Sequence, residues 1–191
     1  MRRRRGIAPP CALALCLAMA APAVAQDGFS IDYDRLFRDH AAALHSPAPG
    51  VEHLELPGPV IVERRAGQVR ATDQSGWGAA GCALQRLLIA AAAVTACPAL
   101  YTPEQRDRVA AQLLRGVDFF AENTVPPMSD SARRTAMMAA LAATRARLAL
   151  SCGPRDSEAL AFASHIAEDR SWQRFARIFE QPRLPVTDPC P

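Results

Sequence analysis

Residues 82–96, CALQRLLIAAAAVTA, decide the fold of this chain. Gln85, Arg86 and Thr95 are the polar residues of the stretch, so a helix built from it is apolar almost all round. A helix of that kind is stable where neighbours cover every side of it. Pro98 follows and ends it. The sequence therefore predicts a central, buried helix.

Apolar positions at helical spacing continue beyond this stretch. Thr102, Pro103 and Gln105 supply an N-cap, a first-turn proline and a capping-box partner, and Ser129 is a second N-cap. We expect helices over 103–122, 130–151, 156–168 and 171–180, followed by a proline-rich tail over 181–191.

The segment that precedes the central helix has a different periodicity. Between residues 51 and 72 apolar and polar side chains alternate, as in half-buried strands. Pro57-Gly58 and Ala66-Gly67 supply two turns, and a helix over 31–45 with Ser30 as N-cap comes first. The predicted fold is α+β and helix-dominated. It is a short three-stranded antiparallel meander followed by a disulfide-stabilised helical bundle.

The first 25 residues are typical of a secretory signal peptide. Four arginines follow Met1, an apolar run over 7–21 comes next, and the small-x-small site 23–25 closes the segment. The apolar run is too short to span a membrane. We therefore expect a single mature domain over 26–191 in the periplasm or secreted, without a transmembrane segment.

Charge argues against nucleic acid as a partner. The 22 basic residues are all arginine, and four of them lie in the signal, so 18 face 19 acids in the mature chain. Those 18 are interspersed with acids along the sequence, whereas a nucleic-acid surface needs clustered basic residues.

Four cysteines remain after the signal, and the predicted compartment favours two disulfides. Cys82 and Cys97 lie about 22 Å apart on a straight helix, too far to pair. In an up-down-up bundle Cys97 and Cys152 lie at the same end, which leaves Cys82 for Cys190. The alternative is a four-cysteine zinc site, which the absence of a CxxC pair disfavours.

Residues 76–81, GWGAAG, match the dinucleotide-binding pattern GxGxxG. No second strand ending in an acid follows the helix, so the βαβ unit of that fold is missing. We interpret the glycines as structural, allowing a tight turn and close packing at the start of the helix, with Trp77 covering the core. No cofactor is expected.

The histidines show no HxH or HExxH spacing, and no GxSxG marks a nucleophile. His45 and His53 meet if the first helix leads directly into the first strand. Asp39 or Glu55 would then complete a weak surface metal site. Isolated surface histidines are the simpler interpretation, and no metal is predicted.

Two further features are candidates for ligand or partner contact. Arg86 is the one charged residue of the most apolar helix, so it pairs with Asp118 or Glu122, binds an anion in a cleft, or extends to the surface. Trp172, Phe175 and Phe179 form a stripe at helical spacing that is either core or a docking face.

These observations favour an exported, periplasmic, non-catalytic binding or accessory protein whose partner is an envelope protein or a small ligand. The alternative is a small exported enzyme, a hydrolase or metal-dependent, with its site near His45 and His53.

Overall fold

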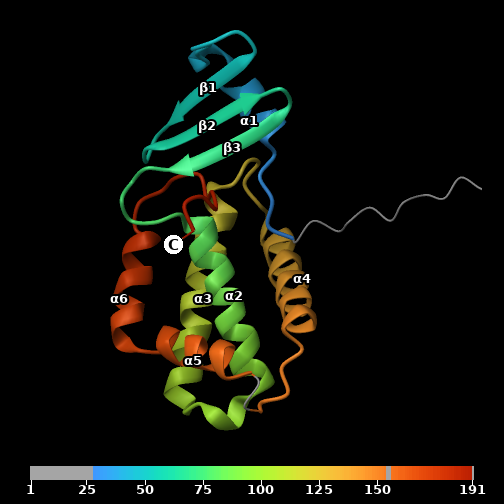
Figure 1. Cartoon of the computed structure of the whole chain (residues 1–191), viewed down its shortest axis with the longest axis vertical. Helices are drawn as coiled ribbons and strands as arrows, with labels where there is room; N and C mark the ends of the chain where they lie inside the picture. Colours follow the sequence, from blue (N-terminus) through green and yellow to red (C-terminus); the bar gives the residue numbers. More distant parts are fainter. Residues whose placement is uncertain (1–27, 154–155, 191) are drawn as a thin grey trace, which may run out of the picture.

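The computed structural model describes residues 28–153 and 156–190, so the predicted export signal lies outside the described residues (Figure 1). The fold is α+β and helix-dominated, as predicted, with a sheet at one end of a helical bundle. The strands are β1 (Val51–Leu56), β2 (Val60–Arg65) and β3 (Gln68–Asp73). The helices are α1 (Tyr33–Asp39), α2 (Ala80–Ala96), α3 (Pro103–Asn123), α4 (Asp130–Leu148), α5 (Ser157–Ile166) and α6 (Asp169–Ile178).

The sheet is the predicted antiparallel meander, in the order β1-β2-β3. Ala66 and Gly67, both with positive φ (49° and 79°), form the two-residue turn between β2 and β3. Two left-handed residues give a turn whose twist matches that of the flanking strands. One face of the sheet is covered, and its fully buried side chains are Leu54, Val60 and Val62.

Helix α1 covers that face with Leu36 and Phe37, which are 1% and 2% exposed. Arg64 of β2 fastens the helix to the sheet, because its guanidinium lies 4.2 Å from the centre of the Phe37 ring and also bonds to Asp34. The same guanidinium hydrogen-bonds to Glu52 and holds the pKa of that carboxyl below its ordinary value.

The prediction of one helix over 31–45 is wrong at both ends. The carboxylate of Asp32, not Ser30, caps α1 by accepting a bond from the Arg35 N–H at 2.9 Å. After Asp39 the chain forms a short 3-10 turn over Ala41–Ala43 and then becomes extended. The backbone of His45 exchanges two hydrogen bonds with that of His53, so residue 45 pairs with the edge of the sheet and is not helical.

Helix α2 is the central element, as predicted. Eleven of its 17 residues are buried. It packs against α3, α4 and α5, and α4 and α6 flank it on opposite sides (Figure 1). Its first turn also reaches the sheet, because Ala79 and Cys82 belong to the cluster that contains Leu54.

The predicted caps of the next two helices are confirmed. Thr102 and Gln105 form a reciprocal capping box at the start of α3, and the Ser129 hydroxyl accepts from the Ala132 N–H at 3.2 Å. Helix α4 ends at Leu148, three residues earlier than predicted, because Ala149 adopts a left-handed conformation with φ 45°.

Both disulfides have the pairing predicted from the bundle geometry. The Cα atoms of Cys97 and Cys152 lie 5.6 Å apart, and those of Cys82 and Cys190 lie 5.4 Å apart. Two such bridges are compatible with an oxidising compartment. In the part of the chain that the structure covers, none of the helices combines the length and apolar character that a membrane crossing requires.

The tail after α6 lacks regular structure, yet it belongs to the core. Leu184 and Val186 are 6% and 1% exposed and pack with the sheet cluster. The Gly81 N–H donates to the Val186 carbonyl at 2.8 Å, and a Cβ on Gly81 would lie 2.7 Å from that oxygen. Close approach of the tail therefore explains this glycine of the GWGAAG segment.

Candidate functional site

The start of α2, the end of α5 and one side of α6 enclose a cleft of about 70 Å³. Its apolar wall is aromatic, with Trp77 before α2, Phe162 on α5 and Phe175 on α6. Its charged or titratable side chains are Arg86, His165 and Arg174. No Asp or Glu among the described residues lines it. The cleft therefore combines apolar walls with cationic groups.

Arg86 is the innermost cation of this cleft and is partly buried. The alternative of an ion pair with Asp118 is not found, because Asp118 bonds to Arg133 of α4 at 2.8 Å. Glu122 is exposed on α3 and makes no bond to Arg86. Within residues 28–153 and 156–190 the Arg86 guanidinium forms no hydrogen bond or ion pair. A guanidinium in that state is available to an anion, for which its planar fork is suited.

The Ser171 hydroxyl and the His165 ring of the cleft lining lie next to polar groups of the protein. The Ser171 hydroxyl donates to the His165 carbonyl at 2.7 Å, and the His165 ring lies 3.5 Å from the exposed Glu168 carboxylate. The Gly81 N–H in the first turn of α2 already binds the tail. Arg174 is exposed at the mouth of the cleft. Among the described residues, Arg86 and Arg174 are the arginines of the lining, and both can contact a bound anion directly.

Trp77 differs from its predicted role. We expected it to cover the core, but 44% of it is exposed, and it forms one wall of the cleft. Gly76 and Gly78 on either side have φ of 78° and 97°, which L side chains rarely adopt. The turn over 76–78 therefore places the indole outside the core and beside Arg86.

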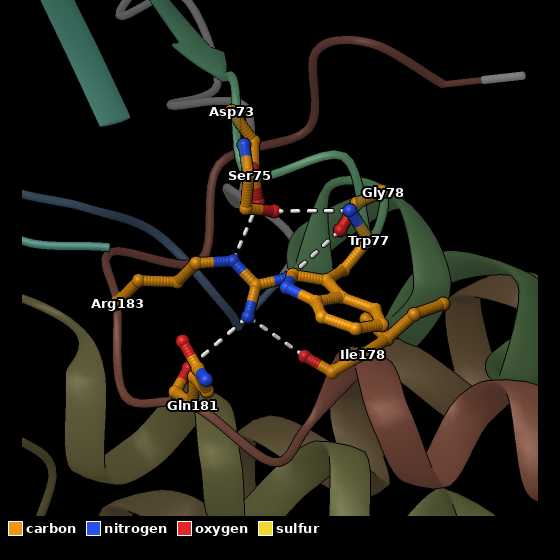
Figure 2. Close-up of polar contacts among 7 residues, drawn as sticks. All are labelled: Asp73, Ser75, Trp77, Gly78, Ile178, Gln181 and Arg183. Atoms are coloured by element: carbon orange, nitrogen blue, oxygen red, sulfur yellow. Dashed lines mark hydrogen bonds and ion pairs between the residues drawn. The ribbon is translucent and has the colours of Figure 1, made fainter. Parts of the chain in front are cut away.

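A buried ion pair holds this turn in place, and the sequence analysis missed it (Figure 2). Arg183 of the tail donates from Nε to Asp73 at 2.6 Å, and both side chains are almost fully buried, at 1% and 0% exposure. Its Nη2 donates to the Gly78 carbonyl at 2.9 Å. Its Nη1 donates to the carbonyl oxygens of Ile178 at 2.8 Å and Gln181 at 3.0 Å.

These bonds connect the end of β3, the turn before α2, the end of α6 and the tail. They therefore position two walls of the cleft relative to each other. The sequence contains one indication of this ion pair, because Arg183 is the only charged residue of segment 182–187, PRLPVT.

The backbones of His45 and His53 pair with each other, but the two side chains do not form a metal centre with other described residues. The His53 ring lies between two carboxylates, 3.1 Å from Glu63 and 3.4 Å from Glu55, and His45 is exposed. The Asp39 carboxylate accepts a hydrogen bond from Nε of Arg35 at 3.3 Å. Across residues 28–153 and 156–190, no three His, Cys, Asp or Glu side chains are grouped so that they would bind a metal ion.

The aromatic stripe of α6 divides between core and surface. Phe175 and Phe179 are 6% and 7% exposed and belong to the main helical core, with their ring centres 6.5 Å apart. Trp172 is 37% exposed and lies beside the first half of α3. Phe175 also forms part of the cleft wall, so this residue alone of the three contacts the candidate site.

No family model, curated protein or solved structure matches this chain. The function is therefore inferred from the geometry of the site.

Proposed function

We propose that this protein is an exported, non-catalytic binding protein that holds a small anionic ligand in the cleft between α2, α5 and α6. One observation carries the proposal. Arg86 projects from the most apolar helix into a cleft that also contains Arg174, and neither arginine has a carboxylate partner among the described residues. A bound anion would supply the missing counter-charge.

The partial burial of Arg86 distinguishes it from an ordinary surface arginine. A guanidinium that is partly removed from water has lost hydration, and an anion that forms two parallel bonds to it restores the lost interactions. Water fully solvates exposed arginines such as Arg134, so an anion that binds there restores no lost hydration.

The lining and the volume restrict the ligand. A space of about 70 Å³ encloses a carboxylate or phosphate group, and the group attached to it extends along the aromatic walls to the mouth of the cleft. Trp77, Phe162 and Phe175 favour a flat apolar group next to the anion, because aromatic faces bury such groups well. Benzoate and phenyl phosphate are therefore suitable probes.

The proposed export has independent support. Residues 1–25 have the features of a secretory signal, and two disulfides are compatible with an oxidising location. The non-catalytic assignment is supported by the chemistry of the described cleft lining, in which the Ser171 hydroxyl donates to the His165 carbonyl and the His165 ring lies next to Glu168, so these two side chains do not pair as nucleophile and base.

The test uses tryptophan fluorescence of residues 26–191. Trp77 and Trp172 are the tryptophans of the chain, so in Trp172→Phe the emission reports on the cleft. We expect saturable changes on addition of benzoate or phenyl phosphate. In the same background Arg86→Met should weaken binding roughly 10- to 100-fold, the value of a charge-assisted hydrogen bond.

Arg134→Met is the matched control, because Arg134 is exposed on α4 and does not line the cleft. It should bind like the parent protein. Equal affinity of the Arg86 and Arg134 variants would contradict the proposed site. Chemical conversion of a bound probe, followed by mass spectrometry, would instead support the enzyme alternative.

A further inference from the structure

A second cavity lies on the opposite side of α2, between α2 and α4. It encloses about 200 Å³, more than the cleft described above. Leu84 and Leu88 of α2 and Phe120 of α3 form its floor, and they are 2%, 6% and 5% exposed. Ala140 and Thr144 of α4 face them, also buried. The two buried α4 side chains in the lining, Ala140 and Thr144, are small.

The floor of this space is apolar, whereas its mouth carries polar side chains. A ligand with an alkyl chain buries its own apolar surface against such a floor, which favours binding. An engineered apolar cavity of about 150 Å³ is large enough to bind benzene. By that comparison the cavity between α2 and α4 accepts a chain of roughly six to eight carbon atoms.

One end of the cavity is polar and cationic. Arg147, in the last turn of α4, is exposed at the mouth and forms no hydrogen bond or ion pair with any residue that the structure describes. Gln85 lies at the mouth as well. Thr144 of α4 also lines the cavity, and its hydroxyl forms no hydrogen bond with the residues that the structure describes. No Asp or Glu of the described residues lines this cavity.

We propose that the cavity binds a medium-chain monocarboxylate, with the alkyl chain between α2 and α4 and the carboxylate at Arg147. The apolar floor suits the alkyl chain, and the cavity volume suits a chain of roughly six to eight carbon atoms. The Arg147 guanidinium, which is unpaired among the described residues, complements the charge of the carboxylate. The Thr144 hydroxyl donates to a carboxylate oxygen or to a water bound to it. This site is independent of the cleft that contains Arg86.

The test is calorimetric titration of residues 26–191 carrying Arg86→Met, which removes the anion site of the other cleft. Octanoate should bind at a one-to-one ratio. Octan-1-ol should bind roughly tenfold more weakly, since it lacks the charge. Hexadecanoate should gain nothing from its longer chain. The alkyl chain of a membrane lipid is chemically similar to that of a free fatty acid. Vesicles of a diacyl phospholipid are therefore titrated separately, and we expect no binding to them.

Three variants locate the site. Ala140→Leu fills the cavity and should abolish octanoate binding, whereas Ala142→Leu on the exposed side of α4 should not. Should Ala140→Leu fail to fold, Arg147→Gln decides, because it should make octanoate and octan-1-ol bind equally. Equal binding of octanoate to the Ala140 and Ala142 variants, or an unchanged preference for octanoate in Arg147→Gln, would overturn the proposal. So would dimerisation that Ala140→Leu abolishes, because a second copy would then occupy the cavity.

Discussion

Two arginines of similar chemistry have opposite environments in this protein. Arg183 is buried, is paired with Asp73 and donates to three backbone carbonyls. Arg86 is partly buried and is without a partner among the described residues. The first therefore contributes to the fold, and the second remains available to a ligand. Local sequence does not distinguish them, since each lies in an apolar segment.

At this scale we predict that Asp73→Asn lowers the free energy of unfolding by about 3–5 kcal/mol, because it leaves the buried Arg183 guanidinium without its counter-charge. Asp130→Asn is the control, since Asp130 is 79% exposed on its side chain and pairs with Arg133 at the surface. That change should cost at most about 1 kcal/mol. Urea denaturation of both variants measures the difference, and equal costs would show that the Arg183 pair is dispensable.

At the scale of elements, helix ends are decided by contacts beyond the helix. Helix α1 ends at Asp39, and the chain then becomes extended and pairs through His45 with His53. Helix α4 ends at Leu148, before Ala149 adopts a left-handed conformation. After α4 the Asp156 carboxylate holds the turn that carries Cys152, accepting from the Ser151 N–H at 2.7 Å and the Gly153 N–H at 3.3 Å. This capped turn presents Cys152 to Cys97 at the end of α2.

These hydrogen bonds, the one from the Ser151 N–H above all, hold the pKa of Asp156 below its ordinary value of 3.8. The lowered pKa means that the carboxylate supports the turn at neutral pH and that this support is lost as pH falls through the folded-state pKa. We predict that the NMR shifts of the Ser151 and Gly153 amides titrate together with a midpoint below 3.8. Asp156→Asn should remove this titration, and a midpoint at or above 3.8 would contradict the capping role.

At the scale of the whole molecule, two apolar clusters are joined through the start of α2 and the tail. The helical cluster contains Leu87 and Phe179, and the sheet cluster contains Leu54, Cys82 and Val186. The two disulfides act at opposite ends of α2. Cys97–Cys152 ties α4 to the bundle, and Cys82–Cys190 ties the last residues of the tail to the first turn of α2.

We predict that Cys152→Ser lowers the Tm of the whole domain, since it opens a loop of 55 residues worth about 4 kcal/mol in the chain-entropy model. Cys190→Ser should have a smaller effect, because Arg183 and Val186 still hold the tail by buried contacts. The Gly81 amide, which donates to Val186, should stay protected from hydrogen exchange in Cys190→Ser. Loss of that protection would show that the disulfide, and not the buried contacts, docks the tail.

Features that depend on local pattern could be predicted from the amino-acid sequence. The meander, the central helix, the caps at Thr102 and Ser129 and the disulfide pairing all follow from periodicity, turn residues and helix length. The end of α1, the partner of Arg183 and the two cavities beside α2 became known from the folded structure. They depend on contacts between residues that are distant along the chain. Arg183 and Asp73 are 110 residues apart, and a cavity is defined by side chains from several elements, so neither leaves a periodic signal.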